Sequence, residues 1–180
     1  MEPRNSLPVG VVVERRTGVT RWAAHVWLPV SVFFGRAPHE SWYEMATGDG
    51  WTQFCAGTAE LELHRGDAEA YMRNLSAPRP SIYVILAPAK GEIPWRLHLV
   101  TASPSEAEAY TVGGDHLVEA VAMPDEIGAV VAEFAKAHFK PEPFKKRKRD
   151  TPPALEEQKF GKEPIFARRG GIAPGGAEDE

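Results

Sequence analysis

Short runs of apolar residues recur through the first half of the chain, and their spacing is typical of β-strands. Residues 9–16 and 26–34 are rich in β-branched and aromatic side chains, so each is predicted to be a strand. Pro29 cannot donate a backbone hydrogen bond, which predicts that the second strand lies at a sheet edge or carries a bulge. Gly48-Asp49-Gly50 separates two aromatic-bearing segments and predicts a hairpin turn.

Four further segments extend the strand pattern. Residues 60–65 alternate between apolar and polar side chains, as a half-buried strand does. Ile82–Leu86 is apolar on both faces and is predicted to be a central strand. Trp95–Thr101 alternates again and is expected to be its antiparallel partner, and Leu117–Val121 is predicted to be the last strand.

Two helices are predicted among the later strands. Ser103-Pro104-Ser105-Glu106 has the spacing of a capping box with proline at the first helical position, so a short helix is expected over 104–110, stopped near Gly113-Gly114. From Pro124 onward the apolar residues recur at helical spacing. This pattern predicts an amphipathic helix that lies on the sheet and ends before Pro141.

The order of these elements indicates the fold class. Strands joined by short turns, without strand–helix–strand alternation, favour antiparallel pairing. The predicted fold is mainly β with two helices: an antiparallel β-barrel or sandwich covered by the C-terminal amphipathic helix. Residues 1–140 make up this β-rich globular domain. Residues 141–180, in which basic residues, glycine and proline are frequent, are predicted to be a disordered tail.

Charge is distributed unevenly between these two parts. The 180 residues carry a formal net charge of −4. Residues 140–180 contain ten basic and eight acidic residues, whereas residues 1–139 contain 11 basic and 17 acidic ones. Because phosphate contacts need a concentrated positive surface, nucleic acid binding is expected only as a weak, salt-dependent association of the tail.

Nothing in the sequence directs the chain to a membrane or out of the cell. Its apolar runs are much shorter than the roughly 18 residues that a membrane helix needs. The N-terminus lacks the basic-then-apolar pattern of a secretory signal, so the cytoplasm is the expected location. Cys55 is the single cysteine, which excludes an internal disulfide.

A polar cluster follows the alternating strand at residues 60–65. Its members are His64, Arg65, Asp67, Glu69, Arg73 and Asn74. In an enzyme His64 would be a general base oriented by Asp67 or Glu69, and in a binding domain the cluster would line a cavity. Strand alternation argues against convergence, because it places His64 and Arg65 on opposite faces. We therefore predict no catalytic residue and treat the six as candidate ligand-binding residues.

The sequence indicates no metal or nucleotide site. The six histidines show neither an HExxH motif nor close pairing with cysteine. The first strand is followed by TGVTR, not by a glycine-rich phosphate loop. Cys55, between Phe54 and Ala56, is expected to be a small buried hydrophobe. We expect no bound cofactor.

The tail contains a candidate docking element. Its residues are Phe144, Lys145, Lys146, Arg147, Lys148 and Arg149. A run of like charges either stays solvated or attracts an acidic partner, and an aromatic beside it can fill a pocket when the segment folds on that partner. These six are the predicted partner-binding residues.

Several stretches resemble one protein family. They are VGVVVERR at 9–16, LELHR at 61–65, Met-Pro before the amphipathic helix, and EPFKKRKR at 142–149. Together they resemble a proteobacterial family of unknown function whose members are commonly encoded beside genes for molybdenum-dependent formate dehydrogenases. Some members carry the label molybdopterin-guanine dinucleotide biosynthesis protein A. The resemblance implies a role in molybdoenzyme biology, in which any molybdenum cofactor belongs to the partner.

Guanylyl transfer needs a glycine-rich nucleotide loop and an acidic magnesium ligand, and neither follows the first strand. The expected function is therefore that of a non-catalytic accessory or maturation factor, which binds a molybdoenzyme of the formate dehydrogenase type or its assembly machinery. Two alternatives remain: a small-ligand-binding or enzymatic β-domain in molybdenum cofactor metabolism, and a weak nucleic-acid binder acting through the basic tail.

Overall fold

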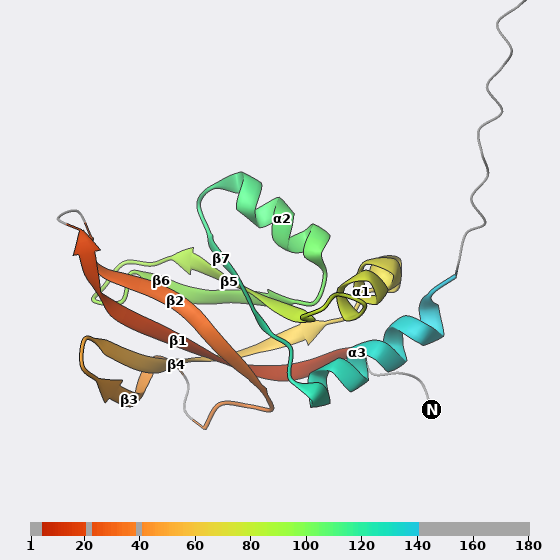
Figure 1. Cartoon of the computed structure of the whole chain (residues 1–180), viewed down its shortest axis with the longest axis horizontal. Coiled ribbons are helices and arrows are strands. Elements are labelled where there is room, and N and C mark those ends of the chain that lie inside the picture. Colours follow the sequence, from red (N-terminus) through yellow and green to blue (C-terminus); the bar gives the residue numbers. More distant parts are fainter. Residues whose placement is uncertain (1–4, 21–22, 39–40, 141–180) are drawn as a thin grey trace, which may run out of the picture. The chain divides into compact units, whose positions relative to one another are not determined.

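Seven strands and three α-helices make up the part of the chain that the computed structural model describes, residues 5–20, 23–38 and 41–140 (Figure 1). In chain order they are β1 (Ser6–Thr20), β2 (Ala23–Phe34), β3 (Tyr43–Gly48), β4 (Trp51–Glu62), α1 (Ala68–Leu75), β5 (Ser81–Pro88), β6 (Trp95–Thr101), α2 (Pro104–Gly113), β7 (Leu117–Ala122) and α3 (Asp125–His138). A short 3-10 helix, η1 (Arg65–Asp67), leads into α1.

The first sheet has the strand order β2-β1-β4-β3, and every neighbouring pair is antiparallel. β3 and β4 form the predicted hairpin, and Gly50 supplies the positive φ of 75° that its turn requires. The prediction for Pro29 is also confirmed: it lies in an edge strand, next to a register shift at which Val12 pairs with Ser31 and Val13 with Pro29, so the extra residue is in β2. β3 pairs with β4 only as far as Cys55, so the rest of β4 has a hydrogen-bonded strand on one side alone among the described residues.

The second sheet has the order β6-β5-β7 and is again antiparallel. β5 is its central strand, as the two-sided apolar run predicts. Half of the predicted capping box before α2 is confirmed, because the hydroxyl of Ser103 accepts a hydrogen bond from the backbone N–H of Glu106 at 3.4 Å. The backbone N–H of Ser103 donates instead to the hydroxyl of Thr101 at 3.0 Å. Gly114 ends this helix with a φ of 74°.

One hydrophobic core contains side chains from both sheets and from α1 and α3. The predicted apolar stripe of α3 is buried, at Ile127, Val131, Phe134 and Ala135. Phe134 packs edge-on against Tyr71 of α1, with 6.3 Å between the ring centroids. These contacts attach the C-terminal helix to the β-domain (Figure 1).

The predicted fold class is confirmed in its main features, with one correction. The described residues form two antiparallel sheets in a sandwich-like arrangement, and these sheets do not close into a barrel. Two helices were predicted, whereas the structure has a third, α1, in a segment interpreted from the sequence only as a polar cluster. Ala68, Tyr71, Met72 and Leu75 recur there at the i, i+3, i+4, i+7 spacing of a helix, so the signal was present and was overlooked.

The structure divides the chain after Pro141. The predicted disordered tail, 141–180, and the docking element at 144–149 lie outside the described residues. Within the described part, no helix has the length and apolar character needed to cross a membrane.

Candidate functional site

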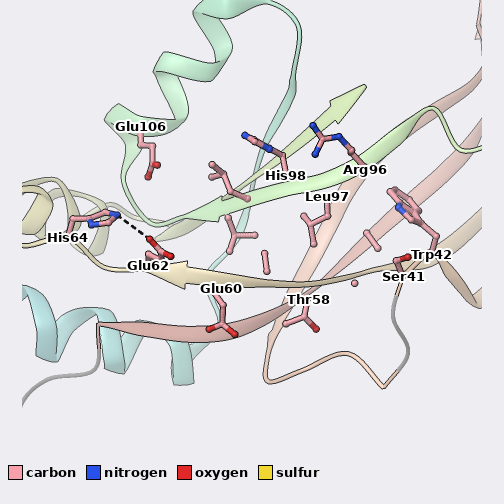
Figure 2. Close-up of a pocket in the computed structure, with 15 residues that line it drawn as sticks. Ser41, Trp42, Thr58, Glu60, Glu62, His64, Arg96, Leu97, His98 and Glu106 are labelled. Atoms are coloured by element: carbon pink, nitrogen blue, oxygen red, sulfur yellow. Dashed lines mark ion pairs between the residues drawn. The ribbon is translucent and has the colours of Figure 1, made fainter. Parts of the chain in front are cut away.

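A groove of about 680 Å³ runs between β4 and β6. Residues 56–60, Glu62 and His64 line it from β4 and the turn that follows, and residues 96–100 line it from β6. Figure 2 shows the two strands side by side, with residue numbers increasing in the same direction. They belong to different sheets and are not hydrogen-bonded to each other. The groove is therefore bounded by the edges of two separate sheets.

The pairing of β4 explains why this edge is open. Just after the C-terminal end of β4, the N–H of Leu63 donates to the carbonyl of Asn5 at 2.7 Å. The odd-numbered residues in this part of β4 therefore direct their backbone N–H and C=O groups toward β1. In an antiparallel ladder the alternate residues direct theirs the other way. The backbone groups of Thr58, Glu60 and Glu62 therefore face away from β1, beyond the point where β3 stops.

Carboxylates gather at one end of the groove. The Oε2 of Glu62 lies 3.9 Å from the Nε2 of His64, and both side chains are more than half exposed. Glu106, in the first turn of α2, lines the same end (Figure 2). Within the described part of the chain Glu106 has no ion-pair partner. This acidic end is therefore not neutralised by a neighbouring lysine or arginine among those residues.

The other end of the groove carries Arg96 and Trp42 (Figure 2). Trp42 has a φ of +49°, an uncommon backbone conformation for a large side chain, which costs about 1–3 kcal/mol. Its ring packs edge-on against Trp27, with 5.8 Å between centroids, and lies 6.5 Å from the ring of Phe54. This packing offsets the backbone strain and fixes an aromatic surface beside Arg96.

Apolar side chains lie between the two ends. Leu97 is directed from β6 toward β4 (Figure 2), and Leu99 and Val100 also line the groove. His98 contacts the rings of Tyr110 and His116, at centroid distances of 5.4 and 5.2 Å. Burial lowers the pKa of His98 below its usual 6.5, and the nearby charges of His116 and Arg96 lower it further. His98 therefore adds little positive charge to the groove at neutral pH.

Of the six predicted ligand-binding residues, His64 alone lines the groove. The others are distributed over η1 and α1, and they are Arg65, Asp67, Glu69, Arg73 and Asn74. Glu69 and Arg73 form an exposed ion pair of 3.2 Å along the helix. Asn74 is buried and uses its side chain in hydrogen bonds to Ser81 and Ala102. The structure thus separates the cluster that appears compact in the sequence.

Four residues of the groove were not predicted from the sequence to be site residues: Trp42, Arg96, His98 and Glu106. One signal was present, since alternation in Trp95–Thr101 places Arg96 and His98 on the same face of a strand. Nothing local indicates that this strand lies beside β4, because that neighbourhood is created by tertiary packing.

Comparison with known proteins bears on the family of the chain. Residues 8–148 match a family described as protein of unknown function (DUF3305). The chain belongs to this family. The match covers the β-rich domain from residue 8 onward and also residues 144–148 of the predicted docking element. Both segments therefore belong to the DUF3305 sequence pattern. Neither a curated protein nor a solved structure matches the chain.

The groove of this DUF3305 domain is lined by both charged and apolar side chains. Among the described residues no group of three or more histidine, cysteine or acidic side chains is placed to hold a metal ion. The groove does present charge of one sign at one end, charge of the other sign at the opposite end, and an apolar surface between them. Such a lining orients a ligand that carries complementary charges.

Proposed function

We propose that this DUF3305 protein is a non-catalytic accessory factor that binds a segment of a partner protein in the groove between β4 and β6. The observation that carries the proposal is the position of the groove, between two sheet edges that no described strand covers. Proteins commonly recognise extended segments of their partners at strand edges, with neighbouring pockets selecting side chains. The unneutralised charges of Glu106 and Arg96 supply electrostatic selectivity.

The family resemblance suggests which partner to test first. It points to a molybdoenzyme of the formate dehydrogenase type, or to the proteins that assemble such an enzyme. On this proposal any molybdenum cofactor is held by the partner. The basic run of residues 145–149 would add a second, electrostatic contact to an acidic surface of the same partner.

A pull-down tests the proposal directly. Tagged protein is recovered from cells growing on formate, and the co-purifying proteins are identified by mass spectrometry with metal and pterin analysis. The comparison variant is Arg96→Gln with Glu106→Gln, which removes one charge from each end of the groove and leaves the net charge unchanged. We expect a molybdoenzyme subunit or an assembly protein with the wild type and much less of it with the variant. Recovery of neither class of protein with the wild type would refute the proposal.

A second candidate function is small-ligand binding, and the size of the groove favours it. A volume of about 680 Å³ falls within the roughly 300–1,000 Å³ of small-molecule sites. His64, beside Glu62, would be the most useful proton-accepting group there. Native mass spectrometry of the protein purified from cells decides this: a small molecule retained by the wild type, and lost on His64→Gln, would support this function.

A further inference from the structure

We propose that the groove recognises an extended peptide segment that carries a lysine or arginine near one end and a carboxylate about six residues away. This inference rests on the proposed function and adds the chemistry of the segment that is bound. The carboxylate can be an aspartate or glutamate side chain or the C-terminus of the partner, since each presents the same group to Arg96.

The acidic end of the groove selects the basic residue. Glu62 and Glu106 come from different elements, β4 and α2, and both line the same end (Figure 2). A cation bound at this end interacts favourably with both carboxylates, so the lining favours a positively charged side chain there. His64 is the single basic neighbour within ion-pair distance of Glu62 among the described residues, and it lies at 3.9 Å.

The opposite end selects the carboxylate. Arg96 lines this end, and its side chain leaves β6 on the same side as His98 (Figure 2). It has no ion-pair partner within the described ranges, so its guanidinium is available for a bidentate interaction with a carboxylate at the rim of the groove. The ring of Trp42, held in place by Trp27, offers an apolar surface beside that contact. The two ends therefore give the groove a polarity.

Glu60 does not disturb this polarity, although it also lines the groove. Its carboxylate accepts a hydrogen bond of 2.8 Å from Arg36, and its charge is compensated there. Figure 2 shows Glu60 and Thr58 directed away from β6. The charges that remain for a ligand are those of Glu62 and Glu106 at one end and Arg96 at the other.

The length of the groove sets the spacing in the peptide. It follows β4 from Ala56 to Glu62, which corresponds to roughly 20 Å at the rise of about 3.3 Å per residue in a strand. An extended peptide of about six residues covers that distance. Between its charged ends, Leu97 and Leu99 favour apolar side chains.

Selection from a library of random dodecapeptides displayed on phage tests this inference with the purified full-length protein. The groove variant is Arg96→Gln with Glu106→Gln. The matched control is Arg73→Gln with Glu69→Gln, which removes one exposed opposite-charge pair from α1, outside the groove. Both variants keep the net charge, and their thermal melting reports whether the fold is retained. Affinities of the enriched peptides are then measured by fluorescence polarisation.

We expect the wild type to enrich peptides with a basic and an acidic residue about six positions apart, in one constant order. Their affinity should fall about tenfold or more for the groove variant and stay unchanged for the control. Replacing the basic residue of the peptide should cost the wild type affinity and cost Glu106→Gln much less. Enrichment without a charge pattern, no enrichment, or equal affinity for the groove variant would overturn the inference. If the pull-down still recovers a partner in any of these cases, the proposed function survives and this chemistry does not.

Discussion

The side-chain amide of Asn74 donates a hydrogen bond of 2.8 Å to the backbone carbonyl of Ala102, across 28 residues of sequence. The same amide donates to the carbonyl of Ser81 at 2.7 Å and accepts from the N–H of Ser81 at 3.0 Å. Asn74 is 5% exposed. One side chain thus joins α1 to the start of β5 and to the segment after β6.

We predict that Asn74→Leu lowers the free energy of unfolding by roughly 2–4 kcal/mol, because leucine is similar in size and removes one buried and two partly buried hydrogen bonds to backbone groups. Urea unfolding measures the change. Glu69→Gln, one helical turn earlier and exposed, is the control and should change stability by less than about 0.5 kcal/mol. A loss below about 1 kcal/mol for Asn74→Leu would show that water replaces these bonds.

A second prediction concerns Gly10 of β1 and Phe33, its partner in β2. The ring of Phe33 lies over Gly10, and a Cβ atom added at Gly10 would overlap it. Gly10→Ala should therefore cost about 1–3 kcal/mol of stability through overpacking. Phe33→Ala in the same chain should relieve most of that cost, since it removes the ring that the methyl group meets. Additive effects in the double variant would contradict this explanation.

The sequence was informative wherever the structure depends on a local pattern. Most strands, the turn at residues 48–50 and the N-cap at Ser103 depend on local patterns, and the structure confirms them. The strand predicted at 60–65 is instead the end of β4, which stops at Glu62, and Arg65 lies in η1. Helix α1 was missed although Ala68, Tyr71, Met72 and Leu75 recur at helical spacing, and the burial of Asn74 beside them was not expected. A buried polar side chain is explained by its hydrogen bonds, and these come from segments 7 and 28 residues away.

Of the residues that line the groove, only His64 was among the residues predicted to bind a ligand. Its walls come from β4, β6, the first turn of α2 and the segment at 41–42, and no local pattern indicates that these segments meet. Arg65 and Asp67, adjacent to His64 in the sequence, follow the chain into η1 instead. Strand alternation argued against convergence of these neighbours, and the fold indeed places only His64 of the six in the groove.

A third prediction concerns acid sensitivity at Glu14, a buried carboxylate of β1. Hydrogen bonds from the side chains of Gln53, at 2.9 Å, and of Arg16 lower its pKa below 4.5. The unfolded chain then binds a proton at a higher pH than the folded chain, so this contribution to stability is present above about pH 4.5 and is lost as the pH falls through the folded-state pKa. Glu14→Gln should flatten that part of the curve of unfolding free energy against pH. An unchanged acid slope in urea unfolding at several pH values would show that other carboxylates dominate it.

The last prediction concerns Lys145, Lys146, Arg147, Lys148 and Arg149, all replaced with serine. Exposed charge pairs contribute about 0–1 kcal/mol each, so five contacts worth a few tenths of a kcal/mol apiece amount to about tenfold in affinity for an acidic partner. A run without apolar side chains has nothing to add to a core, and the melting temperature should stay within about 1–2 °C of the wild type. The control replaces four basic residues that lie outside the family match, Lys159, Lys162, Arg168 and Arg169, and so removes four positive charges in place of five.

Three measurements separate the possible roles of this run. Docking requires that the five-residue variant lose partner in the pull-down while the control does not, and that Phe144→Ala add to the loss, as an aromatic seated in a partner pocket would. A lower melting temperature with unaltered binding would mean instead that the run stabilises its own chain. Retention of the wild type on duplex nucleic acid at physiological salt, absent from the five-residue variant, would favour nucleic-acid binding. The salt dependence of partner affinity separates the two contact surfaces further. The contribution of the basic run should weaken steeply with added salt, because ions screen charges beyond roughly 8–10 Å. Contacts to the apolar side chains between the two ends of the groove should persist.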